Sequence, residues 1–181
     1  VENKIGPLHY FAKTYTMMTW VYEIATNKIL LDFVEDLIGE NILLYNATFI
    51  IKEPMTKTHV SWHQDLTYWG FDDNEKQVSA WIALSNADET SGCMQMIPGS
   101  HKKGIFDHKS TNDKNNVLSR GQTVNNVDID KAILCPLQPG EASFHHGLTL
   151  HASKPNNSKD RRIGLNFQYI TPDLKQLKSK D

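Results

Sequence analysis

Residues 61–65 read Ser-Trp-His-Gln-Asp and place an imidazole and a carboxylate two residues apart. In an extended strand, side chains with this spacing emerge on the same face, about 6.5 Å apart along the backbone. His63 and Asp65 could therefore bind one metal ion. With one further histidine they would form the facial triad typical of non-haem Fe(II) sites, which leaves three coordination positions open. A His-x-Asp pair also occurs often by chance, and the alternative is a half-buried strand histidine paired with Asp65.

The third ligand has to come from elsewhere in the chain. Five other histidines are candidates: His101, His108, His145, His146 and His151. The first two lie in a long polar segment, where a ligand would be poorly held. The next two precede Gly147 at a predicted strand end, and His151 stands between an apolar run and a turn. Spacing alone leaves these last three open.

The predicted strand 162–170 alternates between two kinds of side chain. One face carries Ile163, Leu165, Phe167 and Tyr169, and the other carries Arg162, Gly164, Asn166 and Gln168. The second face is too polar for ordinary core packing and indicates a ligand cavity. There Arg162 would be a fixed bidentate donor for a carboxylate, while Arg161 points outward. The alternative is an exposed arginine pair on an ordinary strand.

The elements that position these residues are mainly strands. Short runs rich in β-branched and aromatic residues predict strands at 42–52, 58–69, 77–85, 132–137, 141–145 and 162–170. Apolar spacing predicts a helix at 26–38, capped by Asn27 or Thr26 and ended by Gly39, and a second helix within 8–24. Strands that follow helices without βαβ alternation favour an antiparallel sandwich or barrel with helices on one face.

Two further features follow from this layout. By strand parity, Asn46 and Thr48 would face the same cavity, with ordinary buried, hydrogen-bonded polar residues as the alternative. Residues 101–130 are polar and read as a long surface excursion, which we expect to be mobile and to close over a site as a lid. Within this excursion, Arg120 is the charged residue best placed to reach a substrate. The alternative is that the excursion is a solvated loop without a function.

Composition limits the class of protein. The 181 residues suit one compact domain, and 39% hydrophobic with 22% charged residues excludes disorder. A net charge of -2 gives no electrostatic reason to expect nucleic acid or an anionic membrane as a partner, and no apolar run approaches a membrane span. Cys93 and Cys135 lie far apart, which argues against a disulfide framework and favours a reducing cytoplasm. The chain begins at Val1, so we expect one domain (1–181) that lacks some N-terminal sequence.

Together these residues resemble the phytanoyl-CoA dioxygenase-like family of Fe(II)- and 2-oxoglutarate-dependent oxygenases. Four ordered motifs carry the resemblance: residues 62–65, 80–84, 92–101 and 151–156, the last followed by the arginine pair at 161–162. The sequences of residues 49–54, 119–122 and 143–147 are most similar to those of the branch that includes the aliphatic halogenases. Those enzymes replace the carboxylate ligand by a small residue, whereas this chain keeps Asp65.

The resemblance implies a fold, a site and an activity. The fold would be a double-stranded β-helix, a cupin-like jelly roll. His63, Asp65 and His151 would bind Fe(II), and Arg162 would hold the distal carboxylate of 2-oxoglutarate. Ser153 and Trp81 match positions that line the cosubstrate pocket.

The implied activity is an O2-dependent dioxygenase that hydroxylates an aliphatic C–H of a small organic or acyl substrate. Halogenation, desaturation, epimerisation or ring formation at the same site remain alternatives, as does a non-enzymatic jelly-roll binding module. Free acid, acyl-CoA, carrier-tethered acyl chain and amino acid are all open as substrates, and the oligomeric state is undetermined.

Overall fold

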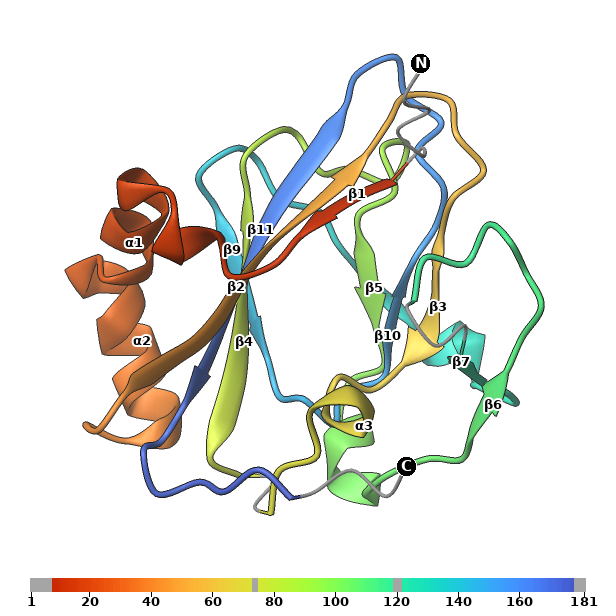
Figure 1. Cartoon of the computed structure of the whole chain (residues 1–181). Coiled ribbons are helices and arrows are strands. Elements are labelled where there is room, and N and C mark those ends of the chain that lie inside the picture. The colour runs from red at the N-terminus through yellow and green to blue at the C-terminus, as the bar shows by residue number, and fades with distance from the viewer. Residues whose placement is uncertain (1–7, 73–74, 119–121, 178–181) are drawn as a thin grey trace, which may run out of the picture.

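The computed structural model describes residues 8–72, 75–118 and 122–177, and its framework is two antiparallel sheets packed face to face (Figure 1). The larger sheet has the order β1 (Leu8–Phe11), β2 (Leu43–Lys52), β11 (Arg162–Ile170), β4 (Gln77–Ala83), β9 (Ala142–His145). The smaller sheet has the order β3 (Val60–His63), β10 (His151–Ser153), β5 (Met94–Met96), β8 (Ile133–Cys135). The predicted mainly β, jelly-roll fold is confirmed.

The N-terminal helices cover the outer face of the larger sheet, at the left of Figure 1. They are the 3₁₀ helix η1 (Thr14–Thr16), α1 (Thr19–Ala25) and α2 (Lys28–Ile38). The side chain of Asn27 accepts a hydrogen bond from the Ile29 amide at 3.0 Å, which caps α2 as predicted, and Gly39 ends it. The core beneath the helices includes Val21 and Val34 from the helices and Leu165 and Phe167 from β11.

The helix predicted within residues 8–24 forms only toward the end of that stretch. Its first part is the strand β1, which pairs with β2 from Leu8 opposite Lys52 to Phe11 opposite Phe49. Only the last part is helical, as α1. The aromatic residues of this stretch suit an edge strand as well as a helix, and the free edge of β2 selects the strand.

The prediction of one strand over residues 58–69 is wrong in its second half. The strand β3 ends at His63, and the short helix α3 (Leu66–Trp69) follows Asp65, whose backbone is already helical. Gly70 ends this helix in the left-handed conformation, at φ 63°. The Leu66 amide donates to the Gly147 carbonyl at 3.1 Å, so a contact from a distant segment anchors the turn.

The polar excursion 101–130 is more structured than its composition predicts. It holds the 3₁₀ helix η2 (Ser100–Lys103) at its start and the paired strands β6 (His108–Ser110) and β7 (Gln122–Val124). Val124 is 5% exposed and packs with Ile97 and Leu150, so the excursion has apolar packing that its polar composition does not predict. Arg120 lies outside the described residues.

Among the described residues, every helix is too short or too polar to cross a lipid bilayer. The 3₁₀ turn η3 (Ile129–Lys131) completes the elements and leads into β8.

Candidate metal centre

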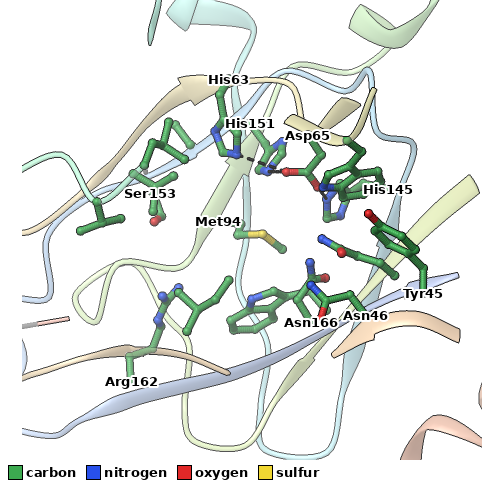
Figure 2. A pocket seen from close by; sticks show the side chains of 18 residues that line it. Tyr45, Asn46, His63, Asp65, Met94, His145, His151, Ser153, Arg162 and Asn166 are labelled. Atoms are coloured by element: carbon green, nitrogen blue, oxygen red, sulfur yellow. Dashed lines mark hydrogen bonds and ion pairs between the residues drawn. The ribbon is translucent and has the colours of Figure 1, made fainter. Parts of the chain in front are cut away.

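A cavity of about 410 Å³ lies between the two sheets. Side chains from both sheets line it, as Figure 2 shows, with histidines and Asp65 on one side and Arg162, Asn46 and Asn166 on the other. The predicted alternation of β11 is confirmed, because Leu165 and Phe167 pack under the helices while Arg162 and Asn166 face the cavity. The larger sheet therefore builds a core on one face and a polar site on the other.

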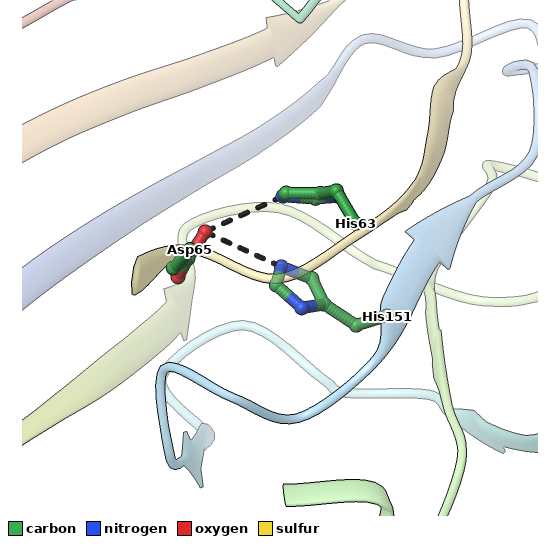
Figure 3. A group of neighbouring side chains, drawn as sticks. All are labelled: His63, Asp65 and His151. Atoms are coloured by element: carbon green, nitrogen blue, oxygen red, sulfur yellow. Dashed lines mark ion pairs between the residues drawn. The ribbon is translucent and has the colours of Figure 1, made fainter. Parts of the chain in front are cut away.

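Three candidate metal ligands meet at one end of this cavity (Figure 3). His63 and His151 are direct cross-strand partners on β3 and β10, with ring centroids 4.1 Å apart. Asp65 Oδ1 lies 3.3 Å from His63 Nε2 and 3.7 Å from His151 Nε2. The ligand atoms of the three residues all lie within 4.8 Å of one another, a spacing that one ion could bridge.

The turn after β3, rather than strand parity, brings Asp65 to the histidines. Gln64, between the two candidate ligands, is fully buried, and its side-chain amide donates to the carbonyls of Gly104 and Leu148 at 2.9 and 2.7 Å. The Phe106 amide donates to Gln64 Oε1 at 2.8 Å. The Gln64 side chain thus points away from the site and is hydrogen-bonded to the excursion. Its two neighbours in sequence, His63 and Asp65, face the cavity.

Backbone carbonyls orient both histidine rings. His63 Nδ1 lies 2.9 Å from the Ser61 carbonyl, and His151 Nδ1 lies 2.9 Å from the Thr149 carbonyl. A carbonyl only accepts, so each Nδ1 carries the proton and each Nε2 presents its lone pair to the site. This is the usual outer-shell arrangement of metal-binding histidines.

The second oxygen of Asp65 is held by two residues that spacing alone did not assign. Ser79 Oγ donates to Asp65 Oδ2 at 3.2 Å, and His145 Nε2 lies 3.3 Å from the same oxygen. Ser79 and His145 are cross-strand partners on β4 and β9. Asp65 therefore offers Oδ1 to the ion, while Oδ2 is engaged by the protein. Spacing left His145 open as a ligand, and the structure places it behind the carboxylate.

The protonation states suit a metal. Burial raises the pKa of Asp65, but the neighbouring histidines, His151 first, outweigh it and hold this pKa well below its usual range. Burial, followed by the charge of His63, lowers the pKa of His151 to about 3. An ionised carboxylate and a neutral imidazole are the forms that bind divalent cations, so Asp65 and His151 fit Fe(II) without prior proton loss.

Arg162 lies at the other end of the cavity, and none of the described residues gives it an anionic partner. Its side chain is 1% exposed, Nη1 donates to the Gly92 carbonyl at 3.3 Å, and Nε has no hydrogen-bond partner. The guanidinium stands 5.3 Å from the centre of the Trp81 ring. Burial lowers the pKa of Arg162 to about 10, which still leaves it charged at neutral pH. A buried cation of this kind fits a ligand carboxylate.

The other predicted site residues are distributed unevenly around the cavity. Ser153, Trp81 and Asn46 line it, whereas Thr48 stands behind Asn46 and accepts a hydrogen bond from its Nδ2 at 3.2 Å. Thr48 is thus a buried, hydrogen-bonded polar residue, the alternative weighed above. Arg161 points outward as predicted and pairs with Glu53 at 2.9 Å.

Comparison with known proteins agrees with this geometry. The family model described as Phytanoyl-CoA dioxygenase (PhyH) matches residues 10–164. The chain belongs to this family, which confirms the resemblance read from its motifs.

One curated protein and two solved structures illustrate what the chain is similar to. A probable alpha-ketoglutarate-dependent hypophosphite dioxygenase of Stutzerimonas stutzeri is 33% identical over 146 residues, which cover 80% of this chain and 50% of that protein. The solved structure of apo ThoJ, a non-heme monooxygenase, matches with a TM-score of 0.82 at 28% identity, over 92% of this chain and 60% of ThoJ.

The second solved structure is that of the epimerase SnoN, in complex with Fe3+, alpha ketoglutarate and nogalamycin RO. It matches with a TM-score of 0.77 at 20% identity, over 97% of this chain and 68% of SnoN, and at this identity it supports the fold alone. The chain spans about half the length of the curated relatives that it matches.

Proposed function

We propose that the protein is an Fe(II)- and 2-oxoglutarate-dependent dioxygenase that hydroxylates an aliphatic C–H of a small organic substrate. The observation that carries the proposal is the buried, unpaired Arg162 in the same cavity as a His-Asp-His cluster. A group of metal-ligating side chains alone would suit many functions. The same group facing a buried guanidinium suits a cosubstrate that chelates the metal at one end and carries a carboxylate at the other.

In this proposal each residue has a distinct task. His63, Asp65 and His151 hold Fe(II), and Arg162 with Ser153 holds the distal carboxylate of 2-oxoglutarate. Trp81 fills the wall between them, since its ring lies against Gly164 so closely that a Cβ there would stand 2.0 Å from Trp81 Cζ2. When bound, Fe(II) supplies the redox chemistry by which O2 and 2-oxoglutarate yield succinate, CO2 and an oxidised product.

Space and polar groups for a second molecule support a separate substrate. Asn166 Oδ1 and Gln168 Oε1 are buried on the cavity face of β11, and neither has a hydrogen-bond partner among the described residues. Gln168 lies six residues beyond Arg162, about 20 Å along the strand, which exceeds the reach of a five-carbon dicarboxylate held by that arginine. These carboxamides would bind hydrogen-bonding groups of the substrate.

Asp65 favours oxygenation over halogenation. Because the carboxylate of Asp65 would hold the ion together with His63 and His151, chloride would not gain the place that the halogenases open by replacing this carboxylate with a small residue. Mass spectrometry of the product, once a substrate is known, should therefore show added oxygen and no chlorine even in abundant chloride.

Succinate release tests the proposal. Purified protein with Fe(II), 2-oxoglutarate and O2 should release succinate, and a substrate from a panel of free acids, acyl-CoA thioesters and amino acids should accelerate the release. Asp65→Ala should abolish it, whereas Arg161→Ala, on the outer surface, should not. Succinate release by the wild-type protein no greater than that of Asp65→Ala would favour a non-enzymatic binding module.

A further inference from the structure

Two buried basic side chains, which would both be cations in water at neutral pH, stand side by side in the larger sheet. Lys52, the last residue of β2, is the direct cross-strand partner of Arg162, the first residue of β11. The two residues are 0% and 1% exposed. Like charges directly opposite each other in a sheet destabilise it, and burial without an anion adds to the cost. Such a pair needs a reason outside the folding of the chain.

The protein offers the Lys52 amine no carboxylate. Its Nζ donates to Ser153 Oγ at 2.7 Å and to the Lys154 carbonyl, and neither cation forms an ion pair with any described residue. The nearest acidic residue in sequence, Glu53, pairs with Arg161 on the outer surface instead. Both buried basic side chains are therefore left without an anion from the part of the chain that the structure describes.

The contacts of Lys52 lead to the cavity. Ser153 lines the cavity together with Arg162, and Lys52 lies directly behind Ser153. Figure 2 shows Ser153 and Arg162 at the same end of the cavity, with Met94 between that end and Asn166. An anion bound between Arg162 and Ser153 would stand within the field of both cations.

We propose that Lys52 is a positioning residue for the distal carboxylate of the cosubstrate, where it holds the Ser153 hydroxyl and supplies a second positive charge beside Arg162. This inference rests on the proposed function. It assigns a role to Lys52, which contacts Ser153 and none of the three candidate metal ligands. It also gives a reason for the presence of a lysine beside a buried arginine.

The charge state of Lys52 should change on binding. Burial, and then the charge of Arg162, lower the pKa of Lys52 to about 6, with an opposing contribution from Cys93 before β5. From β10 it faces only the neutral Ser153 hydroxyl and the Lys154 carbonyl. The amine is therefore mostly neutral at pH 7.5 in the free protein. A bound carboxylate would raise its pKa, so binding should take up a proton.

Calorimetry on the anaerobic Fe(II)-loaded protein tests the inference. Titration of 2-oxoglutarate at pH 7.5 in two buffers of different ionisation enthalpy should show net proton uptake by the wild-type protein. Lys52→Met should weaken 2-oxoglutarate binding about tenfold and abolish the uptake. Binding of 2-oxobutyrate, which lacks the distal carboxylate, should be unchanged by this substitution. Lys154→Met, which alters the exposed neighbouring lysine, is the matched control and should behave as wild type.

The outcomes separate the two proposals. Wild-type binding of 2-oxoglutarate without proton uptake, or equal affinity of Lys52→Met and wild type, would overturn the role of Lys52 alone. An equal loss of affinity for 2-oxoglutarate and 2-oxobutyrate in Lys52→Met would also overturn the role of Lys52, because it would indicate a general structural defect. The wild-type measurement needs no variant, so it decides the matter even if Lys52→Met does not fold. Failure of the wild-type protein to bind 2-oxoglutarate would overturn the proposed function and this inference with it.

Discussion

Arg162 carries the recognition of the cosubstrate at the scale of single residues. Arg162→Ala should lower the affinity for 2-oxoglutarate by about 2 kcal/mol or more, because the distal carboxylate would be left in a buried site without its cation. Arg161→Ala removes a neighbouring arginine that is paired with Glu53 on the surface and should change the affinity little. Calorimetry on both metal-loaded variants gives the comparison. A larger loss of affinity in Arg161→Ala than in Arg162→Ala would contradict the role of Arg162 in binding the cosubstrate.

His145 is the other residue whose substitution is informative. It contacts Asp65 Oδ2 together with Ser79, so His145→Phe should free the carboxylate to rotate and lower metal affinity roughly tenfold to a hundredfold. His145→Gln keeps a donor and should restore much of this loss. Competitive Mn(II) titration and the absorption spectrum of the Co(II) form report affinity and coordination. An unchanged Co(II) spectrum in His145→Phe would show that this histidine does not orient Asp65.

At the scale of elements, the packing of β11 against β4 depends on a missing side chain. Gly164 lies against the Trp81 ring, and an added Cβ would meet ring atoms at 2.0 Å. Gly164→Ala should therefore destabilise the fold by roughly 1–3 kcal/mol through overpacking. The lowered thermal midpoint should partly recover in the double variant with Trp81→Phe, whose ring is smaller. Additive losses in the double variant would contradict the proposed contact.

The elements also show how far the sequence could predict the site. Alternation along residues 162–170 predicted both faces of β11, because a strand buried on one side and lining a cavity on the other leaves a strong period of two. The sequence did not reveal the turn to α3 after His63, since the apolar and aromatic residues of 66–69 suit a strand equally well. That turn depends on the distant Gly147 carbonyl and on the burial of Gln64. Nor could spacing place His145 behind Asp65, because that contact requires the pairing of β4 with β9.

At the scale of the whole molecule, the buried amine of Lys52 links stability to pH. Its pKa is about 6 when folded, against 10.5 for an ordinary lysine, so between these values the unfolded chain binds one more proton. The free energy of unfolding should therefore rise with pH, by up to about 1.4 kcal/mol per unit from this group. Urea unfolding of the metal-free protein from pH 7 to 9 should show a flatter dependence in Lys52→Met. Equal slopes in the two proteins would mean that Lys52 is charged in the folded state.

In the proposed metal centre, three residues from two segments of the chain hold one ion. Anaerobic Fe(II) titration of the wild-type protein tests this assignment most directly, alongside His63→Ala, Asp65→Ala, His151→Ala and the control His101→Ala. We expect one tight site in the wild type and the control. Each of the other three variants should lose most of its affinity, since each removes one of three ligands. Full-affinity binding by His151→Ala would contradict the assignment and make His145 or His146 the third ligand.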